Sequence, residues 1–208
     1  MLRIDESSKT LVAPQQAQLV AEAAPERDEL LALVSSGWQA FAAEIGQPHL
    51  HAVATAPKPG IDVLAFDEAA GRLAVVIVAD NGRSAFGQAL VAAAEVAAWD
   101  AAALADVHDA LQAAVPGDSP RIVLVAGEFD AQMLATMDWL VRRHGLELTA
   151  YAVHTMRFGA ERLLNVTRAY PPAAETAHAP DAAGFLAQVG SAAPPAGHSA
   201  PPPGVPAA

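Results

Sequence analysis

Residues 73–79, with the sequence LAVVIVA, constrain the fold of this chain more than any other segment. Side chains of a β-strand alternate between two faces, so this run is apolar on both faces. Such a strand is stable only at the centre of a sheet, with helices covering both sides. The segment therefore predicts a layered α/β domain.

Strand and helix patterns alternate around that segment through residues 1–170. Apolar runs bounded by turn residues predict strands over residues 2–4, 10–12, 50–56, 61–66, 73–79, 121–126, 149–155 and 163–167. Helical spacing predicts helices over residues 17–45, with an interruption at Pro25, and over residues 84–98, 101–114 and 130–144. Crossover helices between strands favour an α/β sandwich with a central mixed β-sheet flanked by helices.

The composition changes at Pro171. Residues 171–208 contain nine Pro and thirteen Ala, two acidic residues and no Lys or Arg. A segment of this kind buries too little apolar area to offset the entropy of ordering it. We therefore expect a domain over residues 1–170 and a disordered Pro/Ala-rich tail over residues 171–208.

Charge is unevenly distributed along the chain, whose net charge is −11. Residues 1–120 carry six positive and sixteen negative side chains, whereas residues 121–170 carry six Arg against five acids. An acidic surface repels nucleic acid and anionic membranes. If nucleic acid binds, the expected contacts are Arg142, Arg143 and Arg157, although arginines on a solvated helix face need no such explanation.

Several classes of site and location are excluded or disfavoured by the sequence. The chain contains no cysteine, so disulfides, zinc–thiolate sites and thiol nucleophiles are excluded. No apolar run reaches the roughly 18 residues of a membrane-spanning helix, and the N-terminus lacks a signal-peptide pattern. We expect a cytoplasmic protein that does not contact membranes.

Several segments occur in an order typical of one protein family. They are ERDEL at residues 26–30, IDVLAFD at 61–67, FGQAL at 86–90, VLVAGEFD at 123–130 and Trp139-Leu140. With these segments the chain resembles the PD-(D/E)xK nuclease superfamily, in particular small bacterial proteins similar to the C-terminal domain of mismatch-specific endonucleases. The resemblance implies a restriction-endonuclease-like sandwich over residues 1–170, in which residues 61–67 pair with residues 73–79.

The resemblance also implies a magnesium site, in which an aspartate meets a glutamate and a lysine from the adjacent strand. Asp62 matches that aspartate, and Glu26 and Gln88 match two helix positions of the family. The glutamate and lysine positions fall on Ile77 and Ala79, which are apolar. We therefore expect a degenerate site without a cofactor, in which Glu26, Asp62 and Gln88 are vestigial.

Three functions remain open at this point. The first is a non-catalytic nuclease-fold protein that binds DNA, another nucleic acid or a protein. The second is a metal-dependent DNA endonuclease with a rebuilt magnesium site, formed by Asp62, Glu26 and Gln88, with or without His49 or His51. The third is a structural or regulatory subunit without nucleic-acid contact. A homodimer is compatible with each of them.

Overall fold

A computed structural model describes residues 3–5, 10–12, 20–158 and 161–172 of the chain. The tail predicted from the sequence lies, after its first two residues, outside the described residues. The elements follow in this order: β1 (Arg3–Asp5), β2 (Thr10–Val12), β3 (Val20–Glu22), α1 (Arg27–Ser36), α2 (Trp38–Glu44), β4 (Leu50–Thr55), β5 (Val63–Asp67), β6 (Arg72–Ala79), α3 (Gly82–Ala97), α4 (Ala101–Val107), the 3₁₀ helix η1 (Asp109–Ala113), β7 (Arg121–Ala126), α5 (Ala131–His144), β8 (Leu148–Phe158) and β9 (Glu161–Tyr170).

Seven strands form one mixed sheet in the order β3-β8-β7-β6-β5-β4, and β9 pairs with β8. Strands β4, β5 and β6 are an antiparallel meander, whereas β6, β7 and β8 run parallel. Parallel neighbours need crossover connections, which contain α3 and α5. Val63 lies opposite Val76, which confirms the predicted pairing of residues 61–67 with residues 73–79. The α/β class with a central mixed sheet is confirmed.

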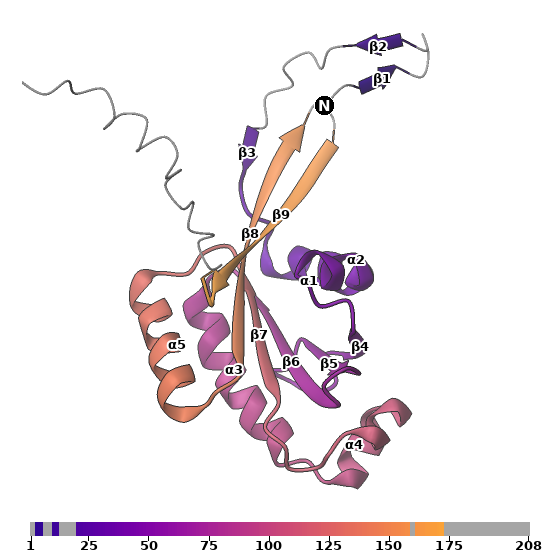
Figure 1. Cartoon of the computed structure of the whole chain (residues 1–208), viewed down its shortest axis with the longest axis vertical. Helices are drawn as coiled ribbons and strands as arrows, with labels where there is room; N and C mark the ends of the chain where they lie inside the picture. Colours follow the sequence, from indigo (N-terminus) through magenta and orange to yellow (C-terminus); the bar gives the residue numbers. More distant parts are fainter. Residues whose placement is uncertain (1–2, 6–9, 13–19, 159–160, 173–208) are drawn as a thin grey trace, which may run out of the picture. The chain divides into compact units, whose positions relative to one another are not determined.

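Alternate side chains of β6 contribute to two different cores, as its sequence predicts. Val75 and Ile77 pack in the core that includes side chains of α3 and α5, whereas Val76 and Val78 pack in the core that includes side chains of α1 and α2. Figure 1 shows α3 and α5 on one side of the sheet and α1 and α2 on the other. Helix α3 buries mainly alanines, whose short side chains allow close helix–sheet contact: Ala85, Ala89, Ala92 and Ala93.

The helix predicted over residues 17–45 is wrong in its described N-terminal part. Residues Val20–Glu22 form strand β3, which pairs with β8 and places Ala21 opposite Met156. The segment is rich in helix-forming residues, but backbone hydrogen bonds to β8 override that weak local preference. A helix begins only after Glu26, and Gly37 divides it into α1 and α2. The helix predicted over residues 101–114 is also shorter, since α4 ends at Val107.

Strands β8 and β9 are longer than their apolar patterns predict. They pair from Ala150 and Tyr170 as far as Phe158 and Glu161. Figure 1 shows this two-stranded ribbon extending beyond the ends of β6 and β7, with β3 beside it.

The predicted hairpin of residues 2–4 and 10–12 is present as β1 and β2, although Leu2 itself is outside the described residues. Among the described residues, no helix has both the length and the apolar character that crossing a membrane requires.

Candidate functional site

Several polar side chains, Asp62 among them, lie at one edge of the sheet, where β6 and β7 end and β5 begins. We call this the carboxyl edge and define it by Arg27, Asp62, Asp80, Asn81 and Glu128. Helices α3 and α5 begin directly after β6 and β7. The start of α1 is tied to the same edge, because the Arg27 backbone N–H donates to Asp80 Oδ1 at 2.8 Å. Ligands of open α/β sheets commonly bind at such an edge.

Asp62 is the buried carboxylate of the carboxyl edge, with only 4% of its surface exposed. Its Oδ2 accepts a hydrogen bond of 2.8 Å from the Val78 backbone N–H, and its Oδ1 accepts one from the Arg27 guanidinium. Burial raises the pKa of Asp62, although the Val78 N–H, Arg27 and Gln88 each act to lower it. Both oxygens therefore have protein partners in place of a metal ion.

Arg27 is the functional residue that the sequence reasoning missed. Its guanidinium pairs with the buried Asp62 and, at 3.1 Å, with the exposed Asp28. A cation in the first turn of a helix is unfavourable with respect to the helix dipole. An arginine within the acidic run ERDEL was therefore the available signal that this side chain has a specific partner.

The two positions that would hold the glutamate and lysine of a nuclease are closed. Ile77 is fully buried and Ala79 is 3% exposed, both within the core under α3. Gln88 reaches the same region from α3 and donates to the Gly60 carbonyl at 3.1 Å. Glu26 is exposed at the start of α1 and makes no side-chain capping hydrogen bond. The fold thus brings Asp62 and Gln88 together, and it leaves Glu26 in solvent.

The helix N-termini at this edge already have side-chain acceptors. Asn81 caps α3 by accepting from the Ser84 N–H at 3.0 Å, and Asp130 caps α5 by accepting from the Met133 N–H at 2.8 Å. Asp130 also pairs with Arg83 at 2.9 Å, and this contact lowers the pKa of Asp130. Free N–H groups at helix N-termini are what makes them anion sites. These caps reduce the capacity of the edge to hold a phosphate.

The residues present do not fit a magnesium ion. Mg²⁺ prefers an octahedral set of oxygen ligands, usually with one or two carboxylates. In the described part of the chain, no three His, Asp or Glu side chains form a group able to hold a metal. The carboxylate of Asp62 is committed to Arg27 and the Val78 N–H. We therefore derive no chemical step through a metal at Asp62.

The histidines proposed to join Asp62 lie elsewhere. His51 is opposite Phe66, four residues along β5 from Asp62, which corresponds to roughly 13 Å of strand. His49 precedes β4 and lies farther along in the same direction. His51 Nε2 is 3.5 Å from Glu68 Oε2. The version of the rebuilt site that uses either histidine is therefore wrong.

The three arginines predicted to contact nucleic acid do not form one patch. Arg142 and Arg143 are in the last turn of α5, next to the start of β8, whereas Arg157 lies near the other end of β8. The nine residue-to-residue steps along the strand from Leu148 to Arg157 span roughly 30 Å. Arg142 pairs with Asp138 and Arg157 pairs with Glu22. A role in binding nucleic acid stays a prediction for each of them.

Comparison of the chain with protein-family models, with curated proteins and with solved structures found no match.

Proposed function

We propose that this chain is a non-catalytic protein with a restriction-endonuclease-like sandwich, and that it acts as a protein-binding module. The observation that carries the proposal is the state of Asp62. Its carboxylate has an internal cation, Arg27, and lies beside two positions, Ile77 and Ala79, that are buried in the apolar core. A hydrolytic metal site needs several oxygen ligands and room for water, and this arrangement offers neither.

The sheet supports the nuclease-like part of the proposal. Asp62 directly precedes β5, the middle strand of an antiparallel meander, and β5 pairs with β6, the strand that carries Ile77. The following helix, α3, carries Gln88 toward the same edge. This is the placement that the resemblance implies for the aspartate, the adjacent-strand position and the helix glutamine. A nuclease-like fold that lacks the catalytic glutamate and lysine is the simplest account of these three positions.

A protein partner is favoured over nucleic acid because most basic side chains in the described part of the chain already pair with carboxylates of the same chain. Ion pairs with acidic residues of the same chain are made by Arg27, Lys58, Arg72, Arg83, Arg121, Arg142, Arg157 and Arg162. Nucleic-acid affinity depends on basic residues that neutralise phosphates. A phosphate contact by any of these eight side chains would have to displace a carboxylate, on a chain whose net charge is −11.

A cleavage assay tests the non-catalytic part of the proposal. We expect no cleavage of duplex or single-stranded DNA or RNA above background with Mg²⁺ or Mn²⁺, for the wild type and for Asp62→Asn alike. Metal-dependent cleavage by the wild type that Asp62→Asn abolishes would instead support the endonuclease with a rebuilt site.

A filter-binding titration at low salt tests the choice of partner. Low salt strengthens every phosphate contact, so it is the condition most favourable to nucleic acid. We expect no saturable binding of DNA or RNA. Binding that is weakened by Arg142→Ala with Arg143→Ala, or by Arg157→Ala, would contradict the protein-partner proposal and identify the arginines responsible. Gln132→Ala, at the start of α5 and away from these arginines, serves as the control variant.

A further inference from the structure

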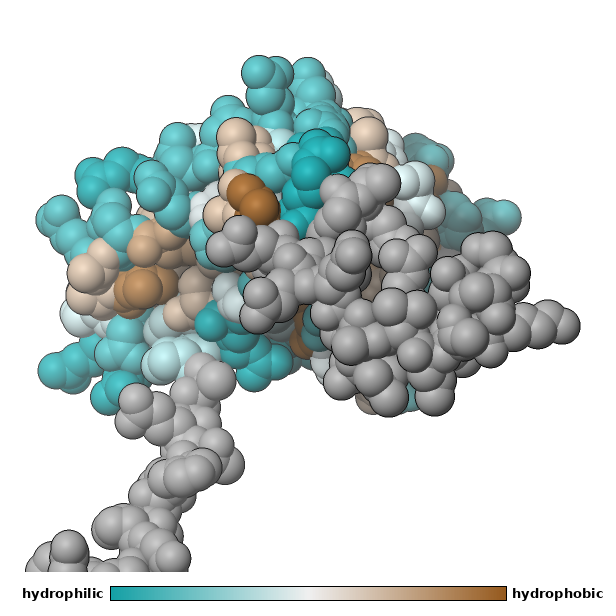
Figure 2. Space-filling model, turned by 90° about the horizontal axis from the view of Figure 1, so that it is seen from above, coloured by the Kyte–Doolittle hydropathy of each residue, from teal (hydrophilic) through white to brown (hydrophobic). Residues whose placement is uncertain are grey.

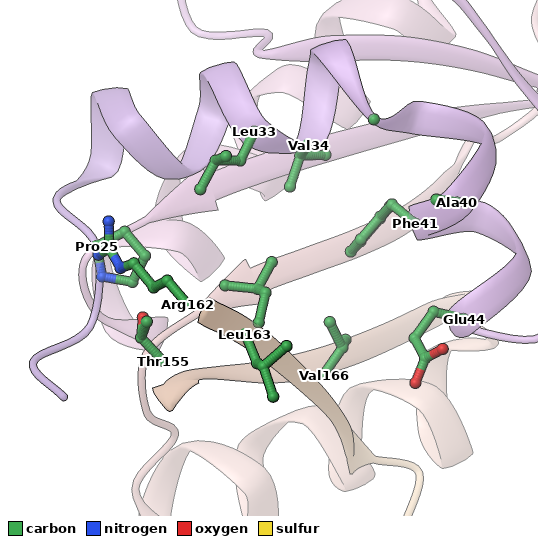
Figure 3. Close-up of a pocket in the computed structure, with 12 residues that line it drawn as sticks. Pro25, Leu33, Val34, Ala40, Phe41, Glu44, Thr155, Arg162, Leu163 and Val166 are labelled. Atoms are coloured by element: carbon green, nitrogen blue, oxygen red, sulfur yellow. The ribbon is translucent and has the colours of Figure 1, made fainter. Parts of the chain in front are cut away.

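An apolar groove of about 470 Å³ lies between the helices α1 and α2 and the ribbon of β8 and β9. Figure 3 shows Leu33, Val34 and Phe41 lining it from the helices, and Leu163 and Val166 lining it from β9. Small-molecule sites typically enclose roughly 300–1,000 Å³ and are mostly apolar with a few placed polar groups. The size and lining of this groove fall within that class.

Thr155 is a buried polar residue at one end of the groove. It lies on β8 between Glu22 of β3 and Leu164 of β9, and only 2% of its surface is exposed. Its hydroxyl is buried, and in the described part of the chain Oγ1 has no hydrogen-bond partner. Figure 3 shows the Thr155 side chain at the end of the groove that Pro25 and Arg162 also line. A buried hydroxyl without a partner costs about 1–3 kcal/mol, so a ligand that hydrogen-bonds to it gains affinity.

The charges around the groove favour an uncharged ligand. Arg162 is paired with both Glu22 and Glu29, and Arg157 is paired with Glu22, so these four charges sum to zero. Glu44 lines the opposite end of the groove, so the net charge of the side chains around the groove is slightly negative. An anionic head group would have to compete with Glu29 for Arg162. A cationic head group that approached the Thr155 hydroxyl would be repelled by the neighbouring Arg162.

Part of the groove lining is exposed apolar surface. Leu33 and Leu163, which line the groove, are 44% and 40% exposed. On the face displayed in Figure 2, hydrophilic side chains predominate and apolar residues form small patches between them. A broad hydrophobic interface would require a contiguous patch of several hundred Å². The volume of the groove, about 470 Å³, suits a small apolar body.

We propose that this groove binds a small uncharged amphiphile, whose alkyl body lies against Val34, Phe41 and Val166 and whose hydroxyl or amide group hydrogen-bonds to Thr155 Oγ1. The amphiphile site goes beyond the protein-binding module and does not depend on it. It also does not involve the carboxylate of Asp62.

The probe for the experiment is 1-octanol, with octanoate and octylamine as charged equivalents. Isothermal titration calorimetry measures affinity, and NMR of methyl-labelled full-length protein reports where the probe binds. We expect one site for 1-octanol with a dissociation constant on the order of 0.1 mM, given the apolar area of eight carbons and the cost of immobilising them. Methyl shifts should concentrate on Val34, Leu163 and Val166. Octanoate and octylamine should each bind at least about fivefold more weakly, because each brings an uncompensated charge into the groove.

Two variants connect the binding to these residues. Thr155→Val keeps the shape of the side chain and removes the hydroxyl, so we expect 1-octanol to bind about three- to tenfold more weakly. Thr167→Val is its control, since Thr167 lies on β9 opposite Ala152 and contributes nothing to the groove lining. Ala40→Trp fills the groove from α2 and should weaken binding more than about tenfold. Ala43→Trp, exposed on the same helix and outside the groove lining, should leave binding unchanged.

Three results would overturn the proposal. The first is that 1-octanol does not bind below its solubility limit. The second is that binding is insensitive to both Thr155→Val and Ala40→Trp, which would place the probe elsewhere. The third is tighter binding of octanoate or octylamine than of 1-octanol, which would assign the groove to a charged ligand.

Discussion

The carboxyl edge and the groove beside β8 and β9 differ in how they treat their buried polar groups. At the carboxyl edge, Asp62 has two partners, and the N-termini of α3 and α5 are capped by Asn81 and Asp130. In the groove, Thr155 is equally buried but its hydroxyl has no partner in the described part of the chain.

This difference indicates where a ligand can add hydrogen bonds. A polar group that already has protein partners offers little to a ligand, whereas an unsatisfied one can gain a full hydrogen bond on binding. The carboxyl edge, which contains the motif residue Asp62, is therefore the less promising binding site. The groove, which no sequence motif marks, is the more promising one.

The largest expected effect comes from placing a glutamate at position 77 and a lysine at position 79, next to Asp62. Ile77→Glu combined with Ala79→Lys places a carboxylate and an ammonium in a core that Ala85 and Ala89 of α3 fill closely. We expect the free energy of unfolding to fall on the order of 4 kcal/mol, because larger and charged groups replace packed apolar ones. Urea denaturation measures this loss.

The same double variant tests whether position 77 and Asp62 form one site. Millimolar Mg²⁺ should raise its urea midpoint and leave that of the wild type unchanged, and adding Asp62→Ala should remove the response. Val91→Glu is the control, since Val91 is 70% exposed on α3 and its substitution should change stability by less than about 0.5 kcal/mol. A double variant as stable as the wild type would show that these positions are not closed.

Two substitutions of Asp62 test how much the hydrogen bonds and the charge of its carboxylate each contribute to stability. Asp62→Ala leaves the Val78 N–H and the Arg27 guanidinium without their acceptor, and we expect a loss of about 3 kcal/mol. Asp62→Asn keeps an oxygen for Val78 and removes a desolvated charge, so its cost should be under about 1 kcal/mol. Urea denaturation at neutral pH compares the two. Equal losses would mean that the charge itself, rather than the hydrogen bond to Val78, stabilises the edge.

Much of the fold follows from local patterns in the sequence, because burial on both faces leaves few arrangements open. Residues 73–79 predict a central strand, and β6 occupies that position with both faces covered. Strand β3 could not be predicted in this way. Residues 20–22 have a helical composition, and their strand exists only because β8 extends far enough to pair with them.

The candidate sites, like the fold, could be predicted only where they depend on local sequence. Asp62 and its apolar neighbour Ile77 were predictable, since strand pairing follows from the short turn between β5 and β6. The partnership of Arg27 with Asp62 joins residues 35 positions apart, and no local rule identifies it. The groove depends on how α1 and α2 sit against β9, so it is a property of the packed structure alone.

Removing the unsatisfied hydroxyl should have the opposite sign to the changes at the carboxyl edge. Thr155→Val replaces the hydroxyl by a methyl group of similar size, and we expect the free energy of unfolding to rise by about 1 kcal/mol. Thr167→Val should change it by less than about 0.5 kcal/mol, because Thr167 is exposed. Thermal denaturation of the ligand-free protein measures both. A loss of stability in Thr155→Val would show that the hydroxyl is satisfied in solution, and the contrast between the two regions would fail.

The smallest expected effect is a pH dependence that isolates the charge of Asp62. Since burial raises its pKa in the folded protein, the folded state takes up a proton more readily than the unfolded state. The stabilisation from protonated Asp62 therefore increases as the pH falls through the raised pKa, and it is fully present below the pKa of Asp62 in the unfolded chain.

The variant Asp62→Asn lacks this titration but keeps all the other carboxylates. Subtracting the free energy of unfolding of Asp62→Asn from that of the wild type therefore removes the contribution of those other carboxylates. From about pH 7 to about pH 4, the difference should shift in favour of the wild type. A shift in the opposite direction would mean that Arg27 and the Val78 N–H outweigh burial, and that the carboxylate prefers to be charged at this edge.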